Sequence, residues 1–385
     1  MRRAFSRVPI LLLMVSCAVL AACKPAASDS QSVSSPIKIG EIASLTGREA
    51  GLGQYTHMGV QLALEEINAH GGVLGRMVEL VSEDSRSKAG ETATATRKLI
   101  SRDQVVAMIG EGASGRCLEG APIAQQAGIP VISPTATNPK VTEVGDCIFR
   151  VCFTDPFQGT VMATFARKSL KIQRVGLLVD VAAPYSVGLA EFFKQRFTAD
   201  GGQIVAQQKF TGGDKDFLAQ LTSLKAAKPE AIFAPRYYGE GGLILLQARR
   251  LGLEIPMLGG DGWEAPELVQ TGGKAADGSF FPVHFSLEST DPRSREFIRA
   301  FEARWQKPPT GASALGYDAL MVLIDAIRRA GSSEPAKIKA ALATTKDHPG
   351  VTGFITLDEG RNARKPAAII QVRDGRFQFV ETVAP

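Results

Sequence analysis

The most constraining feature of the sequence is a stretch in which two short apolar runs each end in small and hydroxyl residues. The runs cover residues 105–109 (VVAMI) and 129–132 (IPVI), and they are followed by residues 110–114 (GEGAS) and 133–137 (SPTAT). Apolar runs of this length, bounded by Gly and Pro, are typical of strands buried on both faces of a parallel sheet. Residues 118–127 between them are predicted to form the crossover helix.

The residues that follow these two strands predict a binding site. In open parallel sheets, ligands bind just beyond the carboxyl ends of the strands. Ser114 and the run Thr135, Ala136 and Thr137 should therefore lie at one edge of the sheet. Their hydroxyls and backbone N–H groups suit an anion such as a carboxylate. We interpret this edge as half of a small-molecule site.

Three glycines in the stretch also match a nucleotide-binding pattern. Gly110, Gly112 and Gly115 spell G-x-G-x-x-G after a strand. That pattern normally follows the first strand of its unit and expects an acid about 20 residues later. Here two strand–helix pairs come first, and residues 131–133 contain no acid. A nicotinamide or flavin site is therefore disfavoured, whereas glycines that merely permit a tight turn remain an alternative.

Composition fits an ordinary globular chain with an export signal. The 385 residues are 44% hydrophobic and 22% charged, which suits two domains. Residues 1–22 combine three arginines with an apolar run at residues 10–20, as in a signal peptide. No other run approaches 18 apolar residues, the length of a membrane span. Without those arginines the net charge of +5 falls to +2, and no basic cluster suggests nucleic acid.

The end of the signal peptide resembles a bacterial lipobox. The sequence Leu-Ala-Ala-Cys ends at Cys23, which implies lipid attachment to Cys23 and a membrane-anchored lipoprotein in the periplasm or at the cell surface. Residues 23–36 then form a polar, Ser-rich tether. Ordinary cleavage near Ala22 is the alternative.

Three further cysteines lie in the body of the chain. An exported protein permits disulfides, and three cysteines leave one unpaired. We predict a Cys117–Cys147 disulfide, with Cys152 buried in an apolar run. A bond that closes a loop of this size would stabilise the protein by roughly 3–4 kcal/mol. The Cys and His spacings do not suggest a zinc site.

Strand and helix patterns alternate along the chain. Strands are predicted at residues 37–43, 77–83, 105–109 and 129–132, and a helical pattern follows each of the first three. The alternation restarts near residues 148–154, with strands at residues 175–179, 204–210, 231–234 and 257–258. This arrangement predicts an α/β fold of two doubly wound, Rossmann-like lobes.

A series of motifs in one order identifies a family. The motifs are IGEIASLTG, GVQLALEEINAHGGVLGR, ISPTATNP, FRVCFTDPFQG, LILLQARRLGL, GGDGW, LGYDALMVLIDAIRRAG and VTGFITLDEGRN. The chain resembles the periplasmic leucine/isoleucine/valine-binding proteins, the type I solute-binding proteins of ABC transporters. The resemblance implies two lobes joined by a three-crossing hinge. Lobe 1 would comprise residues 37–153 plus 285–354, and lobe 2 residues 154–284 plus 355–385.

The resemblance also assigns ligand-binding residues. The carboxylate-binding positions fall on Ser114, Thr135, Ala136 and Thr137, and the second-lobe positions on Tyr185, Tyr237 and Asp261. Asp261 stands where leucine-type receptors have a glutamate for the ligand amine. Leu52 replaces an aromatic pocket residue, and Trp263 is expected to supply the missing apolar wall. An amino acid is a zwitterion, so donors at one end and an anion at the other are chemically coherent.

Each assigned residue also has an ordinary structural explanation. Ser114 and Thr137 could cap a helix and a turn, and Asp261 could be a turn residue. Tyr185, Tyr237 and Trp263 could be packing residues.

The resemblance implies a non-enzymatic receptor. It would be a monomer that captures an amino acid, branched-chain or similarly apolar, and presents it to an inner-membrane ABC permease without a cofactor. Alternatives are a receptor for amides, urea or aromatic carboxylates, or a sensory protein of the same fold. The sequence contains neither a G-x-S-x-G elbow nor an H-E-x-x-H motif, which argues against an exported hydrolase.

Overall fold

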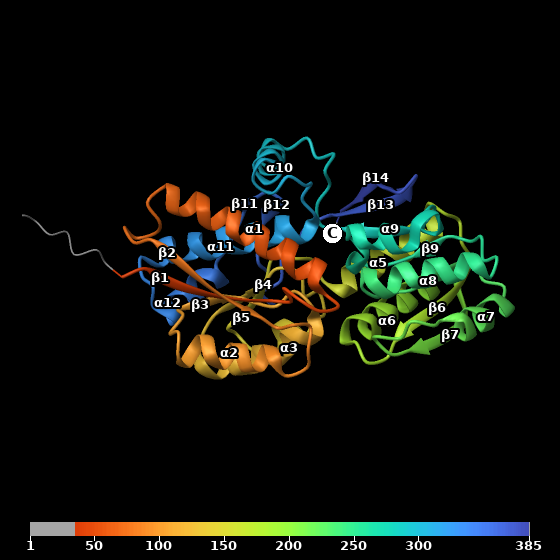
Figure 1. The fold of residues 1–385 in the computed structure, drawn as a ribbon, viewed down its shortest axis with the longest axis horizontal. Helices are drawn as coiled ribbons and strands as arrows, with labels where there is room; N and C mark the ends of the chain where they lie inside the picture. Colours follow the sequence, from red (N-terminus) through yellow and green to blue (C-terminus); the bar gives the residue numbers. More distant parts are fainter. Residues whose placement is uncertain (1–34, 385) are drawn as a thin grey trace, which may run out of the picture. The chain divides into compact units, whose positions relative to one another are not determined.

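The computed structural model describes residues 35–384, in which two sheets form the cores of two lobes (Figure 1). The sheet of the first lobe has the order β2-β1-β3-β4-β5, and all of its strand pairs are parallel. Its strands are β1 (Ile37–Ala43), β2 (Val78–Asp84), β3 (Ala107–Ile109), β4 (Val131–Ser133) and β5 (Ile148–Arg150).

The sheet of the second lobe repeats this order. It runs β14-β13-β10-β9-β8-β6-β7, so its five parallel strands follow the same path as the five of the first lobe. Strands β13 and β14 add an antiparallel edge. The strands are β6 (Arg174–Asp180), β7 (Gln203–Phe210), β8 (Ala231–Phe233), β9 (Met257–Leu258), β10 (Phe280–Val283), β13 (Ala367–Arg373) and β14 (Arg376–Val383).

Helices cover both sheets, which hides the almost wholly apolar strands β3, β4, β5 and β8 from water. The first lobe carries α1 (Ala50–Ala69), α2 (Glu91–Ser101), α3 (Ser114–Ala127), α4 (Lys140–Glu143), α10 (Pro292–Trp305), α11 (Gly311–Ala330) and α12 (Pro335–Ala343). The second carries α5 (Asp155–Lys168), α6 (Pro184–Ala199), α7 (Leu218–Ala226), α8 (Tyr238–Arg250) and α9 (Pro266–Gly272). A small hairpin joins β11 (His348–Gly350) and β12 (Gly353–Ile355).

Helices α1 and α11 pack closely in the first lobe because glycines lie at their contact. A Cβ atom on Gly59 would lie 1.9 Å from the carbonyl oxygen of Ser313, and one on Gly316 would lie 2.3 Å from that of Thr56. Larger residues at either position would force the two backbones apart. This packing fixes α11 beside the sheet, with its first residue directed at the second lobe.

The predicted α/β fold class is confirmed, with small differences at the ends of elements. The crossover helix was expected at residues 118–127, but α3 already begins at Ser114. The glycines of the nucleotide-like pattern serve packing between strands. A Cβ atom on Gly110 would lie 2.8 Å from Val131, and one on Gly112 would lie 2.3 Å from the Thr135 hydroxyl. These glycines let the ends of β3 and β4 approach each other.

The chain passes between the two sheets after β5, after β10 and before β13. The predicted lobe boundaries fall near these passages and remain predictions. The predicted signal peptide, most of the tether and Cys23 lie outside the described residues. Among residues 35–384, no helix combines the length and the apolar character needed to cross a membrane.

The predicted Cys117–Cys147 disulfide is wrong in this structure. Cys117, Cys147 and Cys152 are free and buried. Cys117 lies in the first turn of α3, which starts at the carboxyl edge of the sheet. Cys147 immediately precedes β5 at the opposite edge, where its carbonyl accepts a hydrogen bond from the Val131 amide (2.8 Å). Strand direction therefore separates two cysteines that flank one binding segment in the sequence.

Candidate functional site

The site lies where each sheet reverses its strand order, which is where ligands bind in open α/β sheets. In the first lobe this point falls between β1 and β3, and in the second between β6 and β8. We call Ser114, Thr135, Ala136 and Thr137 the first wall. We call Tyr185, Tyr237, Asp261 and His284 the second wall.

The first wall presents hydroxyl groups that lack protein partners. Thr135 Oγ1 and Thr137 Oγ1 are buried and make no hydrogen bond among the described residues. Ser114 opens α3 and is 1% exposed. Its Oγ accepts a hydrogen bond from the Asn138 amide (3.2 Å), which leaves the hydroxyl proton available for donation. Buried polar atoms without partners are rare, so this wall is suited to an external acceptor.

The backbone of the first wall differs in part from expectation. The Ala136 amide was expected to face a ligand carboxylate, but it donates to Ser133 Oγ (3.1 Å). The Thr137 amide makes no hydrogen bond within residues 35–384. Among the described residues, the free backbone donors of the loop are therefore the Thr135 and Thr137 amides.

In the second wall the Asp261 carboxylate is already held from within the protein, whereas His284 Nδ1 has no partner among the described residues. The Tyr185 hydroxyl donates to Asp261 Oδ1 (2.8 Å) and accepts from the Gly262 amide (3.1 Å). The Tyr185 and Tyr237 rings stack with their centres 5.1 Å apart. Burial, with the charge of Asp261 acting in the same direction, raises the pKa of Tyr185 well above its usual value. Tyr185 therefore stays protonated and orients the Asp261 carboxylate.

His284 belongs to the second wall, although the sequence motifs did not single it out. Its Nε2 lies 3.1 Å from Asp261 Oδ2, and its ring stacks on Phe153 at 3.6 Å between centres. Burial lowers the pKa of His284, although Asp261 opposes that shift. His284 follows β10, and nothing local in the sequence marks it as a partner of an acid 23 residues earlier.

Asp155 is a second acid that the sequence motifs did not reveal. Its side chain is completely buried; Oδ1 accepts from Gln158 (2.9 Å), whereas Oδ2 has no partner in the described part of the chain. Burial raises the pKa of Asp155 to about 7; the nearby Thr137 hydroxyl opposes this shift, and the charge of Asp261 adds to it. The signal that could have found Asp155 is local, because the sequence TDP opens a helix directly after the first-lobe sheet.

A small cavity borders the second wall and meets the first wall at Thr135, whereas Ser114, Ala136 and Thr137 do not line it. Its lining residues include Leu52, Thr135, Tyr185, Tyr237, Asp261, Glu264 and His284. Leu52 therefore lies where the sequence placed it, at the apolar side of the pocket.

Trp263 does not line this cavity, contrary to expectation. It is fully buried in the core of the second lobe, with its ring centre 6.4 Å from that of Phe281. A Cβ atom on Gly259 would lie 2.2 Å from the indole, so the glycine makes room for it. Trp263 turns inward because β10 and α8 enclose it, which residue spacing alone does not reveal.

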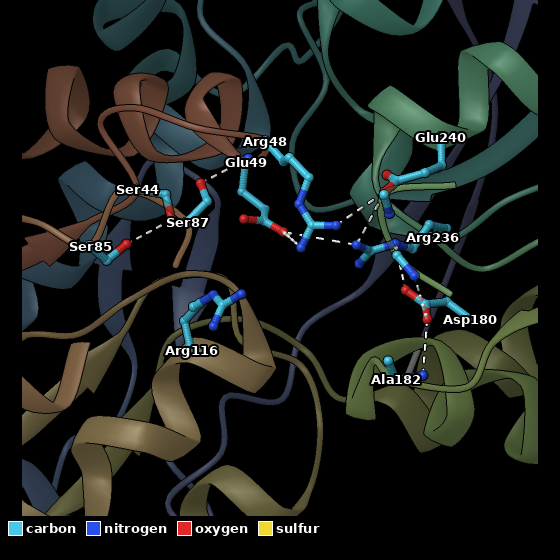
Figure 2. A network of polar contacts seen from close by, with 12 residues as sticks. Ser44, Arg48, Glu49, Ser85, Ser87, Arg116, Asp180, Ala182, Arg236 and Glu240 are labelled. Atoms are coloured by element: carbon cyan, nitrogen blue, oxygen red, sulfur yellow. Dashed lines mark hydrogen bonds and ion pairs between the residues drawn. The ribbon is translucent and has the colours of Figure 1, made fainter. Parts of the chain in front are cut away.

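Charged residues join the two lobes at the rim of the site (Figure 2). Arg236 of the second lobe lies 3.0 Å from Asp180, 3.5 Å from Glu240 and 3.9 Å from Glu49 of the first lobe. Arg48 of the first lobe reaches Glu240 at 3.8 Å. The two lobes thus contact each other directly.

Comparisons with known proteins agree with this geometry. Residues 36–376 match the family described as periplasmic binding protein. The Leu/Ile/Val-binding protein BraC3 of Rhizobium johnstonii is 33% identical over 325 residues, which cover 84% of this chain and 88% of that protein. A leucine-, isoleucine-, valine-, threonine- and alanine-binding protein of Pseudomonas aeruginosa is 30% identical, over 84% of this chain and 86% of that protein.

Solved structures show the same relationship. A leucine-binding protein, LivK, of Thermotoga maritima has 41% sequence identity and a TM-score of 0.88, and the match covers 91% of this chain and 99% of that chain. The branched-chain amino acid transporter substrate-binding protein LivJ of Streptococcus pneumoniae, solved with isoleucine, has 35% identity and a TM-score of 0.87. That match covers 91% of this chain and the whole of the other. The chain therefore belongs to the periplasmic binding protein family, in the group that contains the leucine/isoleucine/valine-binding proteins of ABC transporters.

Proposed function

We propose that this protein is the extracytoplasmic receptor of an ABC importer and that it captures an L-amino acid with an apolar side chain. The observation that carries the proposal is the pairing of two unlike walls across one cavity. The first wall offers hydroxyl donors without partners, and the second offers the oriented carboxylate of Asp261. A zwitterion needs both.

In the proposed complex, the ligand carboxylate accepts hydrogen bonds from Ser114, Thr135 and Thr137. The ligand ammonium lies against Asp261, with the free Oδ2 of Asp155 as a second acceptor. Each charge-assisted hydrogen bond contributes about 1.5–3 kcal/mol. Leu52 and Ala312 supply apolar surface for the side chain. This recognition needs no cofactor and no catalytic step.

An aromatic carboxylate is the second candidate. A solute-binding protein of Rhodopseudomonas palustris BisB5, solved in complex with 3,4-dihydroxybenzoic acid, has 28% identity and a TM-score of 0.82. The stacked Tyr185 and Tyr237 rings favour a flat ligand. Such a ligand would use the first wall but would leave Asp261 and Asp155 without a cation.

The cellular setting is part of the proposal. Residues 1–22 would direct export, and lipid on Cys23 would hold the receptor at the outer face of the inner membrane beside its permease. Mass spectrometry of the mature amino terminus tests this part, since an unmodified residue there would contradict the anchor.

Binding of the free amino acids tests the proposed function directly. Ligand is first removed by unfolding and refolding the protein without residues 1–23. A ligand that binds only the folded state stabilises it by about 2.7 kcal/mol at 100 times its dissociation constant. We expect leucine, isoleucine or valine to raise the midpoint temperature of thermal unfolding, and 3,4-dihydroxybenzoate to leave this temperature unchanged. A shift with the aromatic acid alone would contradict the amino-acid assignment.

A further inference from the structure

Behind the first wall lies a buried arginine that has no acidic partner. Arg150 ends β5 and is completely buried. None of its guanidinium nitrogens forms an ion pair with an acid of residues 35–384 at the 4.0 Å limit. A buried charge is normally paired, because its removal from water is costly. Burial accordingly lowers the pKa of Arg150, and acids such as Asp155 oppose this only from a distance.

The guanidinium group instead binds the backbone of the loop that forms the first wall. Nη1 donates to the Ala136 carbonyl (2.7 Å), and Nη2 donates to the carbonyls of Asn138 (2.8 Å) and Pro139 (3.3 Å). Nη2 also donates to Thr142 Oγ1 (3.2 Å). The planar guanidinium group of Arg150 therefore binds three carbonyl groups of the loop.

These bonds determine which way the loop amides point. In a trans peptide the C=O and N–H groups point in opposite directions. Because Arg150 holds the Ala136 carbonyl, the Thr137 amide of the same peptide points away from the guanidinium. The next peptide is held separately: the Thr137 carbonyl accepts from the Asp155 amide (3.0 Å), and the Asn138 amide donates to Ser114 Oγ (3.2 Å). The loop is thus fixed with the Thr137 amide free and with the Thr135 and Thr137 hydroxyls without partners in the described part of the chain.

We propose that Arg150 is a positioning residue for carboxylate recognition, which holds the loop so that the Thr137 amide and the Ser114 and Thr137 hydroxyls face the ligand, and whose charge is balanced by the ligand carboxylate. This inference rests on the proposed function, since it requires a carboxylate at the first wall. It assigns a ligand-dependent role to a residue that does not touch the ligand.

A purely structural role makes a different prediction. If Arg150 only braces the first lobe, its replacement should weaken the binding of every ligand equally. If Arg150 orients donors toward a carboxylate and balances the charge of that carboxylate, its replacement should weaken the binding of carboxylate ligands selectively. The discriminating measurement is the ratio of affinities for leucine and leucinamide, which differ only at the carboxylate end.

Calorimetric titration of Arg150→Gln with both ligands tests the proposal. We expect leucine affinity to fall roughly 100-fold, because a charge and oriented charge-assisted bonds are lost, and leucinamide affinity to fall less than about threefold. Arg150→Lys keeps the charge without the planar guanidinium group and should lose about tenfold for leucine. It also provides a folded variant if Arg150→Gln does not fold.

Arg361→Gln is the matched control, because Arg361 donates to the carbonyls of Ile148 and Thr142 in the same region but not to the loop of the first wall. It should leave the leucine/leucinamide ratio unchanged. Equal losses for both ligands in folded Arg150 variants, or unchanged leucine binding, would overturn the positioning role while leaving the proposed function intact. If the unmodified protein binds no amino acid, the proposed function fails and this inference fails with it.

Discussion

The two walls of the site differ in how their polar groups are held before a ligand binds. The first wall is built from hydroxyl and amide donors that lack partners, and it is backed by the buried charge of Arg150. In the second wall, Tyr185 and His284 already hold Asp261, and this wall is backed by the apolar core around Trp263. The first wall is completed only by a ligand, whereas the second is arranged in advance.

This difference shows how one cavity can recognise both ends of a zwitterion. Neutral donors can remain without partners at moderate cost until an anion arrives, but a bare buried carboxylate would be far more costly. The acid is therefore held by hydrogen bonds before the ligand binds. The donors of the first wall can remain without partners until the ligand binds, and the ligand then accepts their hydrogen bonds.

The largest expected effect concerns what lies behind the second wall. Trp263→Ala should reduce the free energy of unfolding by about 3–5 kcal/mol, because it opens a cavity in the core. Denaturant unfolding measures this change. Trp263→Phe, which keeps most of the packing, should cost clearly less. If Trp263→Ala weakened ligand binding but left stability unchanged, Trp263 would be part of the cavity after all.

Removal of the charge on the second wall should have the next largest effect. Asp261→Asn keeps the shape of the side chain and should weaken amino-acid binding by about 2–3 kcal/mol, since a charge-assisted bond to the ammonium is lost. Titration calorimetry measures the affinity. Tyr185→Phe removes one of the bonds that orient Asp261 and should cost about 1 kcal/mol. Unchanged affinity in Asp261→Asn would point to a ligand without an amine.

The first wall should show a smaller loss of binding and no loss of stability. Thr137→Val removes a hydroxyl that has no hydrogen-bond partner in the described chain, so we expect about tenfold weaker binding and an unchanged or higher unfolding free energy. Thr96→Val is the matched control: this buried hydroxyl donates to the Thr92 carbonyl (2.7 Å), and its loss should lower stability by about 1 kcal/mol without affecting affinity. Lower stability in Thr137→Val would mean that this hydroxyl has a partner within the protein.

The smallest expected effect is a pH dependence that distinguishes two buried acids. Burial raises the pKa of both Asp155 and Glu111 to about 7. The folded protein therefore holds protons that the unfolded chain has already lost, and stability falls as the pH rises from about 4 to 7. The ligand ammonium should lower the pKa of Asp155, so amino-acid affinity should rise with pH over that interval and level off above it.

Calorimetry in buffers of different ionisation enthalpy detects the released proton. Asp155→Asn should abolish both the proton release and the pH dependence of affinity. Glu111→Gln should preserve both, because the Glu111 carboxylate is held by Ser44 and Ser85 behind the cavity. Proton release that persists in Asp155→Asn would assign it to a group of the second wall instead.

The order of residues was sufficient to predict the fold class, the family and the segments that carry the site. Strand polarity explains why: buried parallel strands are visible as apolar runs, and their carboxyl ends must share one edge of the sheet. Ser114 and Thr135–Thr137 could therefore be grouped from the pattern of residues alone, and the GGDGW motif marked Asp261. These inferences depend only on residue order and on the direction of the chain.

The pairing of side chains that lie far apart in the sequence could be seen only in the folded structure. It joined His284 to Asp261, placed Asp155 near Thr137 and Asp261, set Arg150 behind the first wall and turned Trp263 into the core. It also placed Cys117 and Cys147 at opposite edges of one sheet. Such pairings depend on which face of a strand or helix meets which neighbour, and that is settled by packing between segments that local patterns do not connect.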